Sequence, residues 1–367
     1  MVEGRIFKIS GILTIIIYIF LQKYCLEKNM RVLVGLSGGV DSMCAALRLI
    51  RSGEYVEGAV LRMHEYTEID SAQSVADALG IKLNIIDCQD DFDRIIKSNF
   101  VEEYSSARTP NPCILCNERI KFARLAEFAV ERGFDKIATG HYARVVSRGD
   151  RLTLAIAGDG AKDQTYMLYR LPQSILNMLI LPLSDMPKEE VRRMLRDEGF
   201  EMSEKADSQE ICFLPDGGYA DYVESFKGTF PHGSFIDEQG KYLGEHNGII
   251  RYTVGQRKGL GISLGERVFV TAIDPVENTV TLSREMSGKR EISLTGVVCM
   301  GLDEQESACD VSARVKVRYT ASPVSAVARI QDGEATLIFE QPVKAAPGQS
   351  AVAYDSQGRV LFGGFIV

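Results

Sequence analysis

The sequence predicts an α/β protein in which a doubly wound parallel sheet is followed by a small, mostly β central domain and a C-terminal β-barrel. From residue 30 to about residue 207, short apolar runs alternate with amphipathic helical segments, which is typical of a parallel sheet covered by helices on both faces. After about Pro215, glycine and proline turns separate short alternating runs, which indicates small β domains. We expect domain boundaries at 30–215, 216–287 and 288–367.

The 367-residue chain is long enough for two or three domains, each with its own core. Its net charge of −8 argues against broad, nonspecific affinity for nucleic acid, although a local basic groove is compatible with it. The eight cysteines are scattered and no secretory signal precedes them, which indicates a cytoplasmic location, where thiols stay reduced.

Residues 1–29 differ in character from the rest of the chain. The apolar run 9–21 is short for a membrane span and has no small-residue cleavage site of the signal-peptide kind. Met30 stands directly before the first predicted strand, so we expect residues 1–29 to lie outside the fold, as the product of a start codon assigned too early. A membrane anchor is the alternative, and apart from it we expect no membrane partner.

The first strand and the turn after it form a predicted phosphate-binding loop. Residues 32–36 are apolar, and Ser37-Gly38-Gly39-Val40-Asp41-Ser42 leads into the following helix. Two adjacent glycines let the backbone present its N–H groups, and the helix dipole with the serine hydroxyls adds attraction for an anion. No lysine follows the glycines as it does in a Walker loop. The SGGVDS segment instead resembles the pyrophosphate loop of ATP pyrophosphatases.

Further strands are expected at 55–61, 81–87 and 136–139, with helices at 71–79, 92–104 and 117–132. Ligands of such sheets bind beyond the carboxyl ends of the strands, so the loops at 62–64 and 139–142 become candidate site segments.

A third segment, between two helices, contains the pair Cys113 and Cys116. We expect Pro110 and Pro112 to hold this segment extended until Asn117 begins the next helix. Cys116 would then lie near a helix N-terminus, where the dipole lowers a thiol pKa. The four histidines show no zinc-finger spacing, and two buried thiols are the plain alternative, but the pattern favours reactive cysteine chemistry.

Five further segments resemble, in order, those of tRNA-specific 2-thiouridylases. They are RTPNPCILCNERIKF (108–122), ATGHYAR (138–144), KDQTYMLYRL (162–171), DSQEICF (207–213) and YTVGQRKGLGI (252–262). With the pyrophosphate loop they extend the resemblance from residue 30 almost to the end of the chain. The resemblance implies that the parallel-sheet domain is an ATP-pyrophosphatase domain and that the central domain binds tRNA. It further implies ATP-dependent 2-thiolation of the wobble uridine of tRNA through an adenylated C2 intermediate, with release of AMP and pyrophosphate.

The resemblance also implies roles for individual residues. Cys212 would carry the transferred sulfur as a persulfide, and Cys116 would be the second catalytic thiol, ending in a disulfide with Cys212. Cys113 stands where many members have an aspartate beside the target base, and a cysteine with a lowered pKa can still transfer a proton. ATP with Mg²⁺ would be bound by Gly35, Leu36, Ser37, Gly38, Gly39, Val40, Asp41, Ser42, Leu61 and Gly140. The tRNA would contact Asn111, Pro112, Cys113, His141, Lys162, Asp163, Gln164, Arg318, Tyr319 and Gln349.

Several alternatives remain open at this point. Cys113, Cys116 and Cys212 are also a possible ligand set for a 4Fe–4S cluster whose open iron binds free sulfide, so the sulfur donor is either a persulfide-carrying protein or sulfide itself. An ammonia-using amidotransferase of the ATP-pyrophosphatase class is disfavoured because no glutaminase region is visible. A catalytically silent RNA-binding protein would keep the cations of the predicted strand 314–318 but would have no need of SGGVDS with two reactive cysteines.

Overall fold

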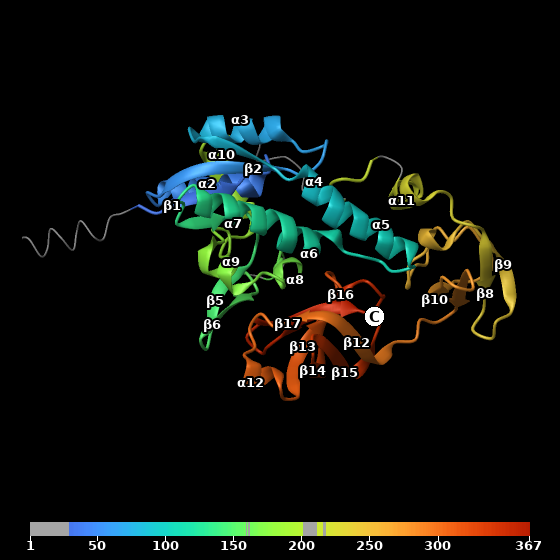
Figure 1. The fold of residues 1–367 in the computed structure, drawn as a ribbon. Helices are drawn as coiled ribbons and strands as arrows, with labels where there is room; N and C mark the ends of the chain where they lie inside the picture. The colour runs from blue at the N-terminus through green and yellow to red at the C-terminus, as the bar shows by residue number, and fades with distance from the viewer. Residues whose placement is uncertain (1–28, 159, 161, 201–210, 216–217) are drawn as a thin grey trace, which may run out of the picture.

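The computed structural model describes residues 29–158, 160, 162–200, 211–215 and 218–367. Residues 1–28, which were predicted to lie outside the fold, and residues 207–210 of the DSQEICF segment are outside this range. Figure 1 shows three parts: a helix-covered parallel sheet, a smaller β domain beside it, and a barrel packed below the sheet domain. The predicted fold class is confirmed. Within the described residues, no helix has the length and apolar character needed to cross a lipid bilayer.

The first sheet has five parallel strands in the order β3-β2-β1-β4-β7. The strands are β1 (Arg31–Gly35), β2 (Tyr55–Arg62), β3 (Leu83–Asp87), β4 (Lys136–Ala138) and β7 (Leu179–Ile180). β1 is central because it pairs with β2 on one side and with β4 on the other. Its residue Val34 lies opposite Gly58 of β2 and Ala138 of β4. The carboxyl ends of β1, β2 and β4 therefore lie together at one edge of the sheet.

Helices cover both faces of this sheet, as a doubly wound fold requires. Val32 and Val34 of β1 pack in a core with α2 (Val40–Arg51), α3 (Ile69–Leu79) and α10 (Lys188–Asp197). Leu33, which points to the opposite face because strand side chains alternate, packs with α7 (Phe122–Glu131) and α9 (Gln173–Met178).

Two long helical columns contain π-helical turns. The first runs through α4 (Gln89–Asp91), the π-helical segment η1 (Phe92–Lys97) and α5 (Ser98–Ser105), which confirms the helix predicted at 92–104. The second runs through α6 (Pro112–Cys116), the π-helical segment η2 (Asn117–Lys121) and α7.

The prediction that the prolines keep residues 110–116 out of helix is wrong. Helix α6 begins at Pro112, whose fixed φ suits the first helical position. Asn111 caps it, because its side chain accepts a hydrogen bond from the Cys113 N–H at 3.2 Å. The second column therefore starts five residues earlier than predicted and includes both cysteines.

The elements of the sheet domain that were not predicted include the hairpin of β5 (Arg144–Arg148) and β6 (Arg151–Ala155) and the short helix α8 (Thr165–Leu168). The hairpin and α8 lie against the barrel, where their apolar residues share a core with Val352, Tyr354 and Val360.

The central part combines α11 (Tyr219–Lys227) with a four-stranded sheet in the order β10-β11-β8-β9. Its elements are β8 (Gly233–Ile236), β9 (Tyr242–His246), the single 3₁₀ turn η4 (Ile249–Arg251), β10 (Phe269–Asp274) and β11 (Thr279–Ser283). Its core is continuous with that of the first helical column, because Phe213 packs edge-on against Phe92 and Phe100 at centroid distances of 5.5 and 5.2 Å.

The last part is a closed barrel in the order β12-β15-β14-β13-β16-β17, with β17 returning to pair with β12. Its elements are β12 (Lys289–Val298), α12 (Glu304–Ser307), β13 (Val311–Lys316), β14 (Val324–Gln331), β15 (Glu334–Val343), β16 (Ser350–Tyr354) and β17 (Val360–Ile366). In β13, Val315 is buried inside the barrel while Arg314 is exposed. The strand ends at Lys316, so Arg318 of the predicted strand 314–318 lies beyond it.

A buried polar seam joins the barrel to the sheet domain. We use this name for the contacts of Thr153, Thr165, Tyr166 and Tyr169 with strands β16 and β17. The Tyr166 hydroxyl donates to the Ser350 carbonyl at 2.8 Å, and the Thr153 hydroxyl donates to the Val360 carbonyl at 2.6 Å. Two hydroxyl pairs complete the seam, Thr165 with Tyr354 at 3.1 Å and Tyr169 with the Ser350 side chain at 3.2 Å.

Replacing Tyr166 by phenylalanine is expected to lower the free energy of unfolding by about 1–2 kcal/mol, because a buried carbonyl loses its donor while the ring still packs. The measurement is chemical denaturation, with Tyr242→Phe as the control at a side chain that is 62% exposed. Equal effects of the two changes would show that the seam hydrogen bond contributes nothing to stability.

Candidate functional site

The predicted phosphate loop joins β1 to α2 at the carboxyl edge of the sheet. Gly39 is the residue before α2, and Gly38 has a φ of +73°, a value that glycine adopts without strain. The Ser42 hydroxyl holds the loop closed, because it accepts a hydrogen bond from the Ser37 N–H at 3.2 Å and donates to the Gly39 carbonyl at 2.9 Å. The loop therefore presents the N-terminal amides of a twelve-residue helix, which is a favourable site for an anion.

Two glycines allow neighbouring segments to approach this loop closely. A Cβ atom on Gly38 would lie 2.5 Å from the Cβ of Ser71, in the first turn of α3. A Cβ atom on Gly140 would lie 2.6 Å from the carbonyl carbon of Asp41. The segment after β4 is therefore in direct contact with the first turn of α2, which brings Gly140 to the phosphate loop.

Asp41 is the carboxylate of the loop, and it has two strong donors. The Lys188 ammonium at the start of α10 lies 2.7 and 2.8 Å from its two oxygens, and the Tyr142 hydroxyl donates to it at 2.6 Å. Lys188 thus places a cation beside the loop, although no lysine follows the glycines in sequence. Asp41 is also the residue of this loop that suits Mg²⁺, which prefers carboxylate and phosphate oxygens.

Sequence reasoning missed Lys188 as a neighbour of the loop, and it placed Tyr142 in the candidate segment 139–142 without its contact to Asp41. Lys188 lies 147 residues from Asp41, and no local pattern connects the two positions. The available signal was weak: a lysine that opens a helix is unusual, because basic residues are favoured at helix C-termini.

The three candidate cysteines occur on two segments. Cys113 is exposed and Cys116 is buried, both on α6, whereas Cys212 is exposed and precedes the buried ring of Phe213. All three are free thiols. The charges of Cys113 and Cys212 each act on the pKa of Cys116, so the three sulfur atoms share one region. The Met63 sulfur, after β2, lies 3.8 Å from the Cys116 sulfur.

The expectation that the helix dipole lowers the pKa of Cys116 is wrong. Burial raises the pKa of this thiol to about 12, and the opposing effect of Lys121 is smaller. The physical reason is that α6 begins at Pro112, so Cys116 lies beyond the first turn and within an apolar cluster that includes Ile120 and Phe92. Desolvation disfavours the thiolate there.

The same thiols were candidates for an iron–sulfur site. Among the described residues, which include Cys113, Cys116 and Cys212, no three histidine, cysteine, aspartate or glutamate side chains are arranged to hold a metal ion. The thiols as placed do not fit a cluster, and we derive no step through one.

His141 connects the phosphate loop to the second helical column, α6–η2–α7 (residues 112–131), which we call the cysteine helix. It follows Gly140, its Nδ1 lies 2.9 Å from the Thr139 hydroxyl, and its ring packs against Phe122 at a centroid distance of 5.4 Å. Burial lowers the pKa of His141 to about 3, with a smaller contribution from Lys121, so the imidazole is neutral. The sheet edge that carries the phosphate loop and the cysteine helix are therefore neighbouring parts of one site. Leu61, near the carboxyl end of β2, lies at the same edge.

The other predicted tRNA residues differ in accessibility. Asn111 and Pro112 form the start of α6, and Lys162 is exposed. Asp163 is buried and accepts hydrogen bonds from the Thr165 hydroxyl and N–H, and the Gln164 side chain accepts from the Tyr142 N–H at 2.9 Å.

On the barrel, Arg318 is exposed and Tyr319 is partly buried, with the Lys316 ammonium 5.6 Å from its ring centre. The Gln349 amide donates to the Thr109 carbonyl at 2.6 Å, and the Thr109 N–H donates to the Pro347 carbonyl at 2.9 Å. The barrel loop 347–349 therefore holds the segment that leads into the cysteine helix.

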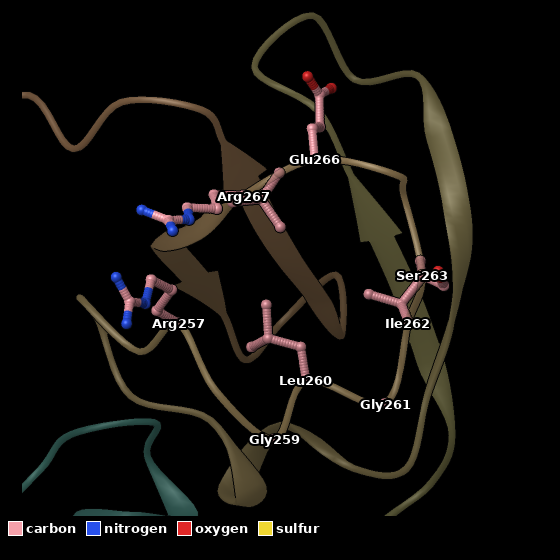
Figure 2. A pocket seen from close by; sticks show the side chains of 9 residues that line it. Arg257, Gly259, Leu260, Gly261, Ile262, Ser263, Glu266 and Arg267 are labelled. Carbon is pink, nitrogen blue, oxygen red and sulfur yellow. The ribbon is translucent and has the colours of Figure 1, made fainter.

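A separate pocket of about 550 Å³ lies in the central part, where it is lined by residues 257–268, which overlap the segment YTVGQRKGLGI (252–262). Figure 2 shows the guanidinium groups of Arg257 and Arg267 on the same side of this pocket, with Ile262 on the other side and Leu260 between them. Its one acidic lining residue, Glu266, is paired with Arg284 at 2.7 Å. Within the described part of the chain neither Arg257 nor Arg267 has an ion-pair partner, so the pocket is basic.

The fold and this site define a class: a nucleotide-binding α/β protein of the ATP-pyrophosphatase type with two attached β domains. Family models match in chain order, with the descriptions "tRNA methyl transferase HUP domain" at residues 30–216, "tRNA methyl transferase PRC-barrel domain" at 220–284 and "Aminomethyltransferase beta-barrel domain" at 291–367.

Among similar curated proteins are those named tRNA-specific 2-thiouridylase MnmA from Syntrophotalea carbinolica, Clostridium perfringens (strain 13) and Acetivibrio thermocellus. The first is 38% identical over 93% of this chain and 99% of its own length. The other two are each 38% identical over 92% of this chain, and over 98% and 99% of their own lengths. The chain belongs to the family of tRNA-specific 2-thiouridylases.

The buried position of Cys116 predicts slow alkylation by iodoacetamide in the native protein at pH 8. With a pKa of about 12, about one thiol in ten thousand is then ionised, and this fraction rises tenfold with each pH unit. Peptide mass spectrometry should find Cys113 and the exposed Cys309 modified well before Cys116. All three should react alike in urea. Equal labelling of Cys116 and Cys113 in the native protein would contradict this account.

Proposed function

We propose that the protein replaces the C2 oxygen of the wobble uridine of tRNA by sulfur, using ATP and releasing AMP and pyrophosphate. The observation that carries the proposal is the contact of the phosphate loop with the Gly140–His141 segment, which packs in turn on the cysteine-bearing helix. A site that activates an oxygen with ATP is thus joined to a site that supplies a thiol. The name of the curated relatives agrees with this chemistry, whereas methyl transfer, named in two of the family-model descriptions, has no need of a pyrophosphate loop.

In the proposed reaction the phosphate loop, residues 35–42, binds the ATP phosphates with Mg²⁺, and Leu61 and Gly140 contact the adenosine. The uridine C2 oxygen attacks the α-phosphorus and pyrophosphate leaves, which converts a poor leaving group into AMP. Asp41 is the proposed Mg²⁺ ligand, and Lys188 and Tyr142 hold its carboxylate at the loop.

Sulfur delivery uses two thiols. The outer sulfur of a Cys212 persulfide attacks the adenylated C2 carbon and AMP departs. The Cys116 thiolate then attacks the Cys212 sulfur, so the bond between the two persulfide sulfurs breaks and its electron pair stays on the uridine sulfur as C2=S. A Cys116–Cys212 disulfide results and needs an external reductant. Cys113, exposed beside them, is the proposed acid or base at the base edge.

The tRNA is proposed to contact Asn111, Pro112, Cys113, His141, Lys162, Asp163, Gln164, Arg318, Tyr319 and Gln349. A target base must leave its stack to reach the thiols, as in other enzymes that modify bases. The proposed domains are 30–215 for catalysis, 216–287 for tRNA binding and 288–367 for the barrel. These boundaries are supported by the sheet topology, because β7 belongs to the parallel sheet, β8 begins the four-stranded sheet and β12 begins the barrel.

The function is tested by nucleoside mass spectrometry of unmodified tRNA incubated with ATP, Mg²⁺ and a persulfide donor or inorganic sulfide. Wild-type protein should form 2-thiouridine, whereas Cys212→Ser and Cys116→Ser should fall to background and the control Cys309→Ser should remain active. Protein prepared without oxygen is compared with the same protein stripped of iron. Thiolation by the iron-containing sample alone would overturn the persulfide route in favour of a cluster, and no 2-thiouridine under any condition would overturn the function.

The basic pocket predicts an interaction with RNA phosphates. Replacing Arg257 and Arg267 by alanine should weaken tRNA binding and reduce the slope of log Kd against log salt by about 1 for each phosphate that is no longer neutralised. Lys241→Ala, an exposed cation on the β8–β9 turn of the same domain, is the matched control. An unchanged salt slope in the double variant would mean that the RNA does not reach this pocket.

A further inference from the structure

Lys121 occupies an unusual position on the cysteine helix. It is the last residue of the π-helical turn η2 and lies five residues after Cys116. In an α-helix of 3.6 residues per turn, a residue five positions on lies about 140° around the axis. In a π-helical turn, whose hydrogen bonds join residue i to i+5, the two residues lie much closer to one face of the helix. The turn therefore brings the lysine round to the face of the helix that carries Cys116.

The charge of Lys121 acts on every candidate sulfur. It opposes the burial effect on the pKa of Cys116 and is the cation that acts on the pKa of Cys212. In return, Cys116, Cys113 and Cys212 together raise the pKa of Lys121 above its usual value, despite the opposing effect of burial. The ammonium is therefore a common electrostatic neighbour of the three thiols.

Among the described residues, Lys121 also lacks a counter-ion within the site. Across the ranges that the structure describes, no carboxylate pairs with it and no hydrogen bond of its side chain is found. The nearby His141 is neutral, and the flanking Ile120 and Phe122 are fully buried. A partly buried cation without an anion is costly, and such a site favours a negatively charged ligand.

We propose that Lys121 stabilises the negative charge that develops on sulfur during transfer to the tRNA. The inference rests on the proposed function and adds to it a residue with no role assigned so far. The charge appears on the outer sulfur of the Cys212 persulfide before it attacks C2, and on the Cys116 sulfur before it attacks Cys212. Lys121 exchanges no proton in these steps. Its ammonium offsets the desolvation that burial imposes on the Cys116 thiolate.

The alternative ligand for this cation is the α-phosphate of the adenylated uridine. The two assignments differ in the step they affect. A lysine that acts on sulfur affects the reaction after pyrophosphate has left, whereas a lysine that acts on the phosphate affects pyrophosphate release itself.

The test compares Lys121→Met with Lys121→Arg under single-turnover conditions, using persulfide-loaded enzyme, ATP, Mg²⁺ and tRNA. Pyrophosphate release and 2-thiouridine formation are followed in the same samples. Lys121→Met should release pyrophosphate at the wild-type rate and form 2-thiouridine about 100-fold or more slowly, the loss typical of a missing charge-stabilising donor. Lys121→Arg, which keeps the cation, should recover most of the rate. The KM values for ATP and tRNA should not change.

The control is Lys136→Met. Lys136 lies on β4, away from the cysteines, and its ammonium donates to the Asn177 carbonyl at 2.7 Å. Equal loss of pyrophosphate release and thiolation in Lys121→Met would overturn the proposal in favour of the phosphate. Unchanged thiolation would overturn it outright. Failure of the proposed function is distinguishable, because the wild-type protein would then form no 2-thiouridine. Thermal unfolding of each variant shows whether it folds. If Lys121→Met does not fold, Lys121→Gln, which removes the charge but keeps a polar side chain, takes its place with the same expected outcomes.

Discussion

The site depends on one constraint, the fixed docking of the barrel on the sheet domain through the buried polar seam. The hydroxyls of Tyr166 and Thr153 reach backbone carbonyls of β16 and β17, so the position of the barrel is set by directional bonds as well as by apolar contact. Beside this seam, Gln349 and Pro347 hold Thr109, which lies just before the cap of α6. The barrel thus sets where the cysteine helix begins, although it contributes no thiol to the site.

The sheet domain was predictable because its signals are local. The apolar runs, the SGGVDS turn and the helix at 71–79 follow from residue spacing alone, and each appears in the structure within a few residues. The partners of Asp41 were not predictable. Lys188 and Tyr142 reach it only through packing of α10 and of the segment after β4. The β5–β6 hairpin was missed although its signal is local: Gly149 and Asp150 form a two-residue connection between the two strands, and Gly149 has a φ of +57°.

Cys116 shows how a local argument fails when burial opposes it. The helix-dipole effect weakens within one turn, and the early start of α6 at Pro112 moves Cys116 beyond that range. Desolvation within an apolar cluster then becomes the larger effect. A thiol with a raised pKa is protected from adventitious oxidation. Under the proposed function, such a thiol stays inactive until the arrival of substrate changes its surroundings.

The hold of the barrel loop on Thr109 has a consequence for synthesis. Gln349 is itself tied to the final strand, because the Ile366 N–H donates to its carbonyl at 2.8 Å. Ribosomes make the phosphate loop and the cysteine helix first and this strand last, and domains generally fold in that order. A nascent chain can therefore fold its sheet while Thr109 is still unsupported. The support that the barrel loop gives to Thr109 is therefore absent from an unfinished polypeptide, which has its cysteine-bearing helix but not this contact.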